Sequence, residues 1–556
     1  MNNNEGDVHL CTKCYRIYSV DDENENLMII NVPDDTEKKY NNIKFKIYTI
    51  KHGYTIANDI RDYLFDMNIH SEVVSEIDPN DENKNELYYI VLFPQTLVKF
   101  PKYNKYIIYQ LEQVKQSKWI DRRYEVAIMD SIKTFEYSTK NYENIIQDCK
   151  WHMTYLPMPI SKTIIHNNNA NDIDILFYGA YNNRRINILN CVMSKYNIVV
   201  IDDIFGEELY PFIKKAKIVI NIHYYKNAIL ETARLNEILR FNKLIISESS
   251  CDSENISELY GNIIVFFDEI DDDLNNIDNL YKLLDYYLDN TNYDKHVNNQ
   301  TKYIKKLYDN SKLYFERCLV SSGLISPRCM NFNVNSDEIY CISLDETLKT
   351  GYLPFISQEY LIKNIIKFPA IKHLYGWVGC GLSYKVLMLN AVSHNLNTIT
   401  ICEDDCLFPK DFDAKYSIIK EFLNIIDNWD IFVCAIADFH DETQISNIYK
   451  YKGLTFIEID KFTSMIFNIY NKKVFNTITS WDETNHDVTS NTIDRTLSTK
   501  NLKIITIYPF TVGCLNVMSS LWHVKTDYSD MFTKSEKILE SKINNFDKNK
   551  IIDFGI

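Results

Sequence analysis

The stretch Thr398-Ile-Thr-Ile-Cys-Glu403-Asp404-Asp405 is a β-branched run that ends in three consecutive acids. The run predicts a buried strand, because β-branched side chains suit a pleated sheet. Side chains alternate along an extended chain, so we expect Glu403 and Asp405 to point one way and Asp404 the other. Neighbouring carboxylates repel one another and raise their pKa values unless a cation neutralises them. The stretch predicts a divalent metal that carries a diphosphate, although an acidic turn is the simpler interpretation of three acids alone.

The sequence around this run has a regular order. Residues 376–384 read Gly-Trp-Val-Gly-Cys-Gly-Leu-Ser-Tyr and predict a glycine-rich turn. Apolar residues then recur at helical spacing, at Leu382, Val386, Leu389, Val392 and Leu396. After the acids, Trp429–Cys434 predicts the next buried strand. The order is a glycine-rich turn, an amphipathic helix, a strand and an acid triplet.

This order resembles glycosyltransferase family 25, the lipopolysaccharide and collagen sugar transferases, which have a GT-A fold. That family carries a Cys-x-x-Ser-His turn and helix before a Glu-Asp-Asp strand end. Here Cys380 and Ser383 match, whereas Tyr384 stands in place of the usual His. Later landmarks of the family match at Asp494, Tyr508-Pro509 and Ser519-Ser520. The resemblance covers about the last two-fifths of the chain.

The resemblance implies a role for several residues. A nucleotide-diphosphate sugar would be held through Mn²⁺ or Mg²⁺ on Glu403 and Asp405, with Asp404 on the nucleoside side. His523 lies where related GT-A enzymes place a late metal ligand, although a lone His is more often structural. Asp494 would take the proton of the acceptor hydroxyl, with Asp487 behind it. No Arg lies between Arg328 and Arg495, so the remaining grip on the donor phosphates would come from Lys side chains and backbone amides.

The first half of the chain alternates strands and helices from Ile43 onward, which predicts mostly parallel sheets with helices on both faces. A second such unit begins at Asp172, where a strand runs into Gly179 and a helix starts near Arg184. Glu231, Arg234 and Glu237 recur every three residues and so tend to share one side of a helix.

This order resembles a GT-B glycosyltransferase. The segments Tyr109–Gln113, Glu136–Asn141 and Tyr155–Pro157 resemble the linkage between its two Rossmann-like domains in a bacterial and viral branch. The resemblance implies a donor bound without metal.

The donor-binding residues implied by this resemblance follow the first strand of the second unit. The Gly179 turn would approach the diphosphate, and Arg184 and Arg185 would face the same anion as the helix N-terminus. Glu231 would bind ribose or sugar hydroxyls. The simpler interpretation is that the arginines solvate a helix, and that Glu231 and Glu237 form salt bridges with Arg234 and Arg240. For Glu237, the choice between a ligand role and a salt bridge stays open.

Length and composition limit the function classes. A chain of 556 residues predicts three or four domains. The net charge of −16 and a pI near 5.3 argue against a nucleic-acid binder, and 13 scattered cysteines indicate a reducing compartment. The N-terminus lacks the pattern of a signal peptide. The uncharged run 504–522 contains Pro509 and Asn516, which favours a strand and loop over a membrane span. Frequent Asn, Ile, Lys and Tyr are typical of an AT-rich genome, such as that of a large DNA virus.

We therefore expect an α/β protein with a polar leader (1–42), two Rossmann-like domains of a GT-B-like pair (43–157 and 158–285), a helical crossover and linker (286–335) and a GT-A-like domain (336–556). The expected function is a bifunctional glycosyltransferase of the hexosyltransferase class, located in the cytoplasm (host cytoplasm or virus factory if viral). It would move sugars from UDP- or GDP-sugars to a glycan or glycoprotein acceptor. Two alternatives stay open: modules that bind sugar nucleotides or glycans without turnover, and a metal-dependent nucleotidyltransferase.

Overall fold

The computed structural model describes residues 8–10, 17–19, 42–165, 172–517 and 528–555. Two short strands, β1 (Val8–Leu10) and β2 (Ile17–Ser19), pair antiparallel near the N-terminus. The predicted ligand His523 and the Ser519-Ser520 landmark lie outside the described residues. None of the described helices is long and apolar enough to span a membrane.

The first large sheet is parallel throughout, in the order β4-β3-β5-β6-β7-β8. Its strands are β3 (Lys44–Tyr48), β4 (His70–Val74), β5 (Leu87–Val91), β6 (Tyr106–Gln110), β7 (Thr134–Glu136) and β8 (Met153–Tyr155). The helices of this unit are α1 (Tyr54–Asp66), α2 (Arg122–Asp130) and α3 (Gln147–His152). All of these elements fall within the predicted range 43–157.

The second sheet is also parallel, in the order β10-β9-β11-β12-β13. Its strands are β9 (Ile173–Tyr178), β10 (Ile198–Ile201), β11 (Ala216–Asn221), β12 (Leu244–Glu248) and β13 (Ile264–Phe267). The helices are α4 (Asn183–Met193), α5 (Tyr210–Lys215), α6 (Thr232–Leu239), α7 (Ser253–Tyr260) and α8 (Ile277–Leu288). The prediction of parallel α/β units is confirmed for both sheets.

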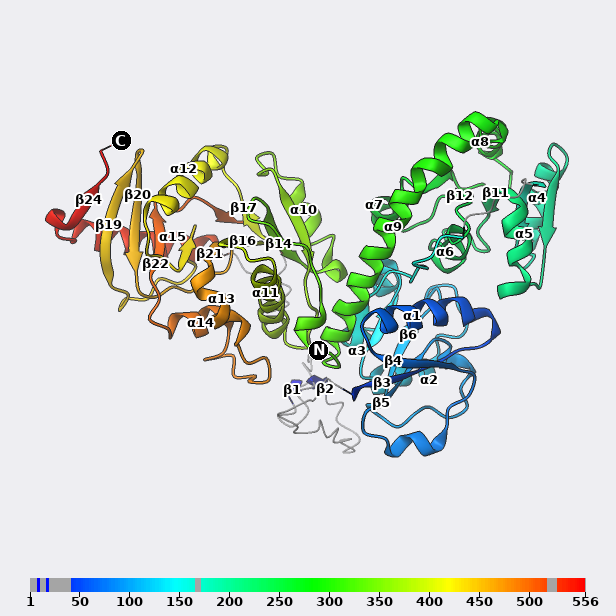
Figure 1. Ribbon diagram of the computed structural model, residues 1–556, viewed down its shortest axis with the longest axis horizontal. Coiled ribbons are helices and arrows are strands. Elements are labelled where there is room, and N and C mark those ends of the chain that lie inside the picture. Colours follow the sequence, from blue (N-terminus) through cyan, green and yellow to red (C-terminus); the bar gives the residue numbers. More distant parts are fainter. Residues whose placement is uncertain (1–7, 11–16, 20–41, 166–171, 518–527, 556) are drawn as a thin grey trace, which may run out of the picture.

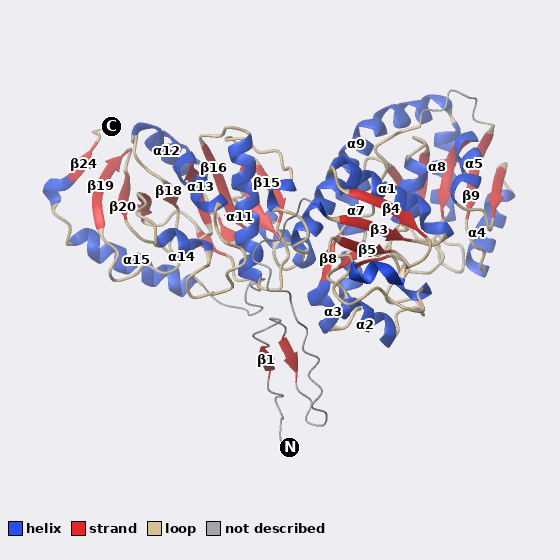
Figure 2. Cartoon of the chain, turned by 60° about the horizontal axis from the view of Figure 1, so that its bottom comes forward, coloured by secondary structure: helices blue, strands red, loops and turns tan. Residues whose placement is uncertain are grey.

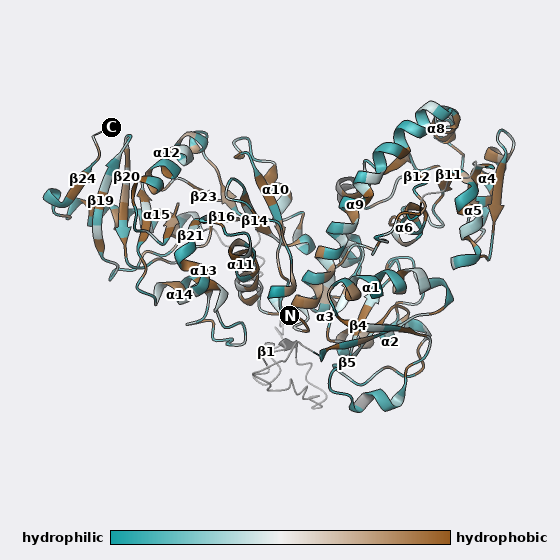
Figure 3. Ribbon diagram, viewed as in Figure 1, coloured by the Kyte–Doolittle hydropathy of each residue, from teal (hydrophilic) through white to brown (hydrophobic). Residues whose placement is uncertain are grey.

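The third sheet has nine strands of mixed direction, in the order β15-β14-β16-β21-β18-β22-β20-β19-β24. Its strands are β14 (Ile339–Ser343), β15 (Ile365–Pro369), β16 (Thr398–Glu403), β18 (Ile431–Val433), β19 (Ile445–Tyr451), β20 (Leu454–Ile459), β21 (Phe467–Asn471), β22 (Ile504–Tyr508) and β24 (Ile551–Asp553). β14, β15 and β16 are parallel, and β21 runs antiparallel to β16 and β18. β19 and β20 carry both hydrophilic and hydrophobic residues (Figure 3).

Helices and a small ribbon cover this third sheet. The helices are α10 (Tyr352–Ile356), α11 (Gly376–Ser393), α12 (Phe412–Ile425), α13 (Lys472–Thr479), α14 (Ile493–Ser498) and α15 (Ser529–Asn544). The short strands β17 (Cys406–Leu407) and β23 (Gly513–Cys514) pair antiparallel beside the end of β16. Figure 2 shows the strands of this sheet on the side of the molecule opposite the two parallel sheets.

The glycine-rich stretch does not form the predicted turn, because α11 already begins at Gly376. Its glycines allow close packing instead. A Cβ on Gly379 would lie 2.3 Å from the carbonyl oxygen of Ile371, and one on Gly381 would lie 2.5 Å from the ring of Trp481. The helix is also buried on most of its sides rather than amphipathic. Contacts distant in sequence therefore explain these glycines.

The long helix α9 (Asn290–Ser321) joins the three sheets (Figure 1). Its Arg317 is fully buried and donates to the backbone oxygens of Tyr155 (3.1 Å) and Ala370 (2.6 Å). The same guanidinium donates to Glu346 Oε2 at 2.8 Å, and Glu346 Oε1 accepts the backbone N–H of Tyr155 at 2.7 Å. One ion pair thus ties α9 to β8 of the first sheet and to the segments that follow β14 and β15 of the third.

Replacing Arg317 by Met tests this junction. We expect the free energy of unfolding to fall by about 3–5 kcal/mol, because Glu346 would stay buried without its partner. The control Arg61→Met removes an ion pair whose side chains are 46% and 51% exposed, and it should change stability by less than about 1 kcal/mol. Urea unfolding followed by tryptophan fluorescence measures both variants. Equal effects would contradict this role of Arg317.

Candidate active sites

The acid triplet lines a cavity of about 520 Å³ at the carboxyl ends of strands in the third sheet. Glu403 is the last residue of β16, and Asp404 and Asp405 follow it. Leu344, directly after β14, and Ala370, directly after β15, line the same cavity. Asp494, at the start of α14, lines it as well. The fold therefore brings the four predicted acids of the C-terminal site together.

β16 ends at Glu403, so Asp404 and Asp405 lie in the turn that follows, and the strand alternation expected for the triplet does not extend over these two residues. Glu403 Oε1 lies 3.4 Å from the thiol of Cys380, and Asp405 Oδ2 lies 3.7 Å from that of Cys514. Asp404 accepts a hydrogen bond from the Ser343 hydroxyl. It also packs on Gly351, where a Cβ would come within 2.3 Å of Asp404 Oδ2. Asp404 therefore has partners distinct from those of the other two acids.

Of the three carboxyl groups, Asp404 is influenced by a nearby cation, because burial raises its pKa and the charge of Lys367 opposes that rise. Burial, and then the charge of Asp405, raises the pKa of Glu403 above its usual range. Burial, and then the charge of Asp404, raises the pKa of Asp405 in the same way. Burial raises the pKa of Asp404 to about 6, against the opposing effect of its hydrogen bond with Ser343. Asp405 Oδ1 is buried and has no hydrogen-bond partner among the described residues. A bound cation would relieve this repulsion.

A metal ion fits here only if the protein and the substrate share its coordination. Within the described ranges, no group of three or more His, Cys, Asp and Glu side chains could hold a metal ion. Mg²⁺, however, is usually bound through one or two carboxylates and completed by substrate phosphates. Glu403 and Asp405 could supply such a pair, and the unpaired Asp405 oxygen fits a ligand role. His523 lies outside the described residues, so its role as a metal ligand stays a prediction.

The two predicted proton acceptors are placed differently. Asp494 Oδ1 accepts from the Thr492 hydroxyl at 2.7 Å and from the backbone N–H of Arg495 at 2.8 Å, and both residues line the cavity with it. Asp487 instead lies on an exposed turn, where it accepts from the hydroxyls of Thr489 and Ser490, and it does not line the cavity. Of the two candidate proton acceptors, the structure thus places Asp494 and not Asp487 in the lining of the cavity.

Sequence reasoning missed Lys372, which lies three residues after the end of β15. It lines the cavity, and its ammonium group donates to the backbone oxygens of Lys150 (2.9 Å) and Met153 (2.6 Å) in the first unit. Burial lowers the pKa of Lys372 to about 7. Its partners are more than two hundred residues away in the sequence, so no local pattern could have identified it.

A second cavity, of about 410 Å³, lies between the carboxyl ends of the two parallel sheets. Leu111 and Tyr137 follow β6 and β7 of the first sheet, and Gly179 follows β9 of the second. Ligands bind at this edge of open parallel sheets. We refer to this cavity as the arginine cleft, because Arg185 and Arg234 line it.

The guanidinium groups of Arg185 and Arg234 both pack closely against Gly179. Gly179 has a φ of +129°, and a Cβ there would lie 3.3 Å from Arg185 Nη1 and 3.5 Å from Arg234 Nη1. Arg185 Nη2 donates to Glu231 Oε1 at 3.1 Å, and burial lowers the pKa of Arg185 to about 10. Three buried atoms have no hydrogen-bond partner among the described residues: Nε and Nη2 of Arg234 and Oε2 of Glu231. The cleft thus offers donors for an anion and an acceptor for a hydroxyl group.

Arg184 does not face the cleft, so its predicted position beside Arg185 is wrong. Its guanidinium makes two bonds with Glu248 and donates to the backbone oxygens of His223 and Ile270, each at 2.9 Å. Consecutive helix residues point about 100° apart, so the two arginines cannot share a direction. Arg184 therefore links β12 to α4. Of these two adjacent arginines, only Arg185 lines the cavity.

The salt bridge considered between Glu237 and Arg240 does not form. Glu237 lines the arginine cleft and accepts the Thr55 hydroxyl from α1 at 3.1 Å. Burial raises its pKa. Arg240 pairs with Asp59 at 2.6 Å rather than with Glu237. Glu231 does lie 3.7 Å from Arg234, so the salt-bridge interpretation holds for that pair.

The three linkage segments meet at this cleft: Gln113 and Tyr137 line it, and the Tyr109 hydroxyl donates to the backbone oxygen of Leu156. Glu136 accepts from Gln110 Nε2 at 3.0 Å and from Asn141 Nδ2 at 2.7 Å. Ser138 donates to Asp252 Oδ2 of the second unit at 3.0 Å. These polar contacts, together with a shared apolar core, fix the two parallel sheets relative to one another.

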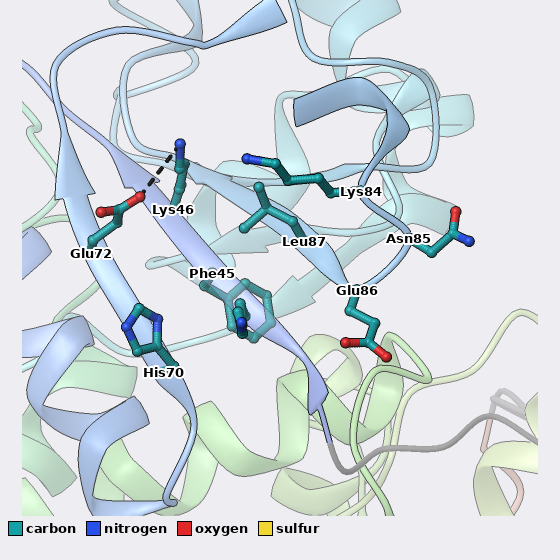
Figure 4. A pocket seen from close by; sticks show the side chains of 9 residues that line it. Phe45, Lys46, His70, Glu72, Lys84, Asn85, Glu86 and Leu87 are labelled. Atoms are coloured by element: carbon teal, nitrogen blue, oxygen red, sulfur yellow. Dashed lines mark ion pairs between the residues drawn. The ribbon is translucent and has the colours of Figure 1, made fainter. Parts of the chain in front are cut away.

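A third pocket, of about 480 Å³, lies along β3, β4 and β5 (Figure 4). Three of its charged side chains, those of Lys46, Glu72 and Lys84, form ion pairs with one another or with Asp81. Lys46 lies 3.4 Å from Glu72 and 2.7 Å from Asp81, and Lys84 lies 2.6 Å from Asp81. These three side chains therefore do not call for a ligand.

The similar proteins named below match only part of this chain. No family model matches the chain. An alignment over 190 residues is 27% identical to an uncharacterized protein of Acanthamoeba polyphaga mimivirus. It covers 32% of this chain and 66% of that protein. This relative is viral, which agrees with the source that the composition predicts.

Two solved structures are similar in part. An alpha1,3-fucosyltransferase has a TM-score of 0.29 and 9% identity, over 48% of this chain and 83% of that one. A glycosyltransferase from Rickettsia africae ESF-5 has a TM-score of 0.31 and 8% identity, over 51% and 99%. With TM-scores this low, neither likeness assigns a fold or an activity to this chain.

The raised pKa values in the acid cavity predict a pH dependence of stability. A carboxyl group whose pKa is higher in the folded state contributes stability that is complete below about pH 4 and is lost as the pH rises through the folded pKa. In EDTA, the wild-type Tm should therefore fall between pH 5 and pH 8.5, and Glu403→Gln should reduce that fall. The control Glu421→Gln changes a side chain that is 51% exposed and should keep the wild-type fall. An unchanged fall in Glu403→Gln would contradict the repulsion described here.

Proposed function

We propose that the chain is a bifunctional glycosyltransferase with one sugar-nucleotide site in each half. The observation that supports this most is the position of its two chemically distinct cavities, each at the carboxyl ends of parallel strands. One is lined by arginines around a glycine turn and the other by carboxylates. The pair of parallel sheets corresponds to a GT-B-like module, and the mixed sheet with its acid triplet to a GT-A-like module.

In the arginine cleft, the donor diphosphate is held without metal. Arg185 and the unpaired Nε and Nη2 atoms of Arg234 face the anion, and Gly179 lets its backbone approach. The unpaired Oε2 atom of Glu231 accepts a hydroxyl of the ribose or sugar. Positioned positive charge stabilises the departing diphosphate, which is often the largest single contribution to catalysis.

In the acid cavity, Glu403 and Asp405 would hold Mn²⁺ or Mg²⁺ together with the donor diphosphate. Asp404, which accepts a hydrogen bond from Ser343, would lie on the nucleoside side. The metal, when bound, neutralises charge on the leaving diphosphate. Asp494 takes the proton of the acceptor hydroxyl. Its Oδ1 atom is fixed by Thr492 and by the Arg495 amide, so the carboxylate has a defined orientation in the cavity.

Metal-dependent turnover tests the acid cavity. Release of UDP or GDP from a panel of UDP- and GDP-sugars is measured with Mn²⁺ and with EDTA. Asp405→Asn should lower the metal-dependent rate at least about 100-fold, because it removes a ligand charge. The matched control Asp411→Asn alters an acid that is 57% exposed and pairs with Lys415, and it should keep the wild-type rate. Transfer of the nucleoside monophosphate, with release of the sugar 1-phosphate, would instead favour the nucleotidyltransferase.

Metal-independent turnover tests the arginine cleft. Arg234→Ala should lower release of UDP or GDP in EDTA about 100-fold and leave the Mn²⁺-dependent rate unchanged. Arg122→Ala, at a side chain that is 74% exposed, should change neither rate. If Arg234→Ala and Asp405→Asn abolish the same activity, the chain has one active site rather than two. Binding of donors without turnover in the wild type would favour the scaffold.

A further inference from the structure

The acid cavity is not built by the C-terminal half alone. Four of its lining residues belong to the first parallel-sheet unit and lie between β7 and β8: Tyr142, Gln147, Lys150 and Trp151. The last three are on α3. This segment is separated from the acid triplet by about half of the chain, yet both line one cavity. We call these four residues the α3 wall.

The α3 wall is fixed to the C-terminal half by polar contacts. Lys372, itself a lining residue, donates to the backbone oxygens of Lys150 and Met153 and so caps the C-terminal end of α3. Lys349 pairs with Glu143 at 3.1 Å, just before the helix. Arg317 and Glu346 bind the backbone of Tyr155, just after it. The wall therefore has a defined position relative to the acids.

The chemistry of the wall differs from that of the rest of the cavity. It has no carboxylate and no arginine, and it offers an indole, a phenol, an amide and one ammonium group. A second indole, that of Trp377 on α11, lines the same cavity and is 7% exposed. Flat aromatic faces pack well against the apolar C–H face of a pyranose ring, and amide groups pair with its hydroxyls. Lys150 is the one cation among the four residues of the wall, so the wall offers a diphosphate a single charged partner.

We propose that the α3 wall is the acceptor subsite of the acid cavity, with Trp151 as the surface on which a pyranose ring of the acceptor glycan stacks. This inference rests on the proposed function, because it assigns the acceptor side of the same site. The first unit then contributes to both cavities: its strand ends line the arginine cleft, and its α3 wall completes the acid cavity. The acceptor specificity of the C-terminal reaction depends on the N-terminal half of the chain.

Binding of simple glycosides to the full chain tests this inference without turnover. The probes are the methyl glycosides of glucose, galactose and mannose in both anomeric forms, detected by saturation-transfer NMR. Trp151→Ala should raise the Kd of a bound glycoside by about tenfold or more, and Trp151→Phe should restore much of the affinity. The control Trp119→Ala removes an indole that is 49% exposed and does not line this cavity, so it should bind like the wild type.

Two results would overturn the inference: wild-type affinity in Trp151→Ala, or no glycoside bound by the wild type. Donor turnover measured in parallel separates the two proposals. If binding depends on Trp151 but the wild type consumes no donor, the glycan site stands and sugar transfer fails. If the wild type transfers sugar and Trp151→Ala leaves the acceptor KM unchanged, only the acceptor subsite fails.

Discussion

Parallel β-strands place all of their carboxyl ends at one edge of a sheet, and this constraint determines where both cavities of this protein lie. Loops that follow the strands converge there, so residues from distant parts of the sequence meet. Glu403 is at such an end of β16, and Gly179 follows such an end of β9. Two sheets face each other across the arginine cleft, whereas the acid cavity lies between the third sheet and a helix of the first unit.

The buried ion pair of Arg317 and Glu346 makes this arrangement specific. An unpaired charge in the interior is costly, so the two side chains strongly favour the geometry in which all their bonds are made. Those bonds reach the backbone of Tyr155 and Ala370, which belong to different sheets. The same junction holds α3 against the acid cavity. The two halves are thus coupled in structure, while each cavity keeps its own charged groups.

The sequence predicts those features that depend on local pattern. Buried apolar runs predicted β16 and β18 of the third sheet and β9 of the second, and Gly179 follows β9 as expected. The errors have physical causes. Gly379 and Gly381 are required by contacts with Ile371 and Trp481, which no local window contains. Arg184 and Arg185 are adjacent in sequence but point in different directions on a helix. Lys372 and the α3 wall are recognisable only once the chain is folded.

Two independent nucleotide sites in one chain are the central claim, and the stoichiometry of nucleotide binding tests it most directly. Isothermal titration with UDP and with GDP, in Mn²⁺ and then in EDTA, counts sites without requiring the correct sugar or acceptor. The account predicts two sites per chain in Mn²⁺ and one in EDTA, with the metal-dependent site absent from Asp405→Asn. A single site under both conditions, or two sites that are both lost on removing the metal, would contradict it.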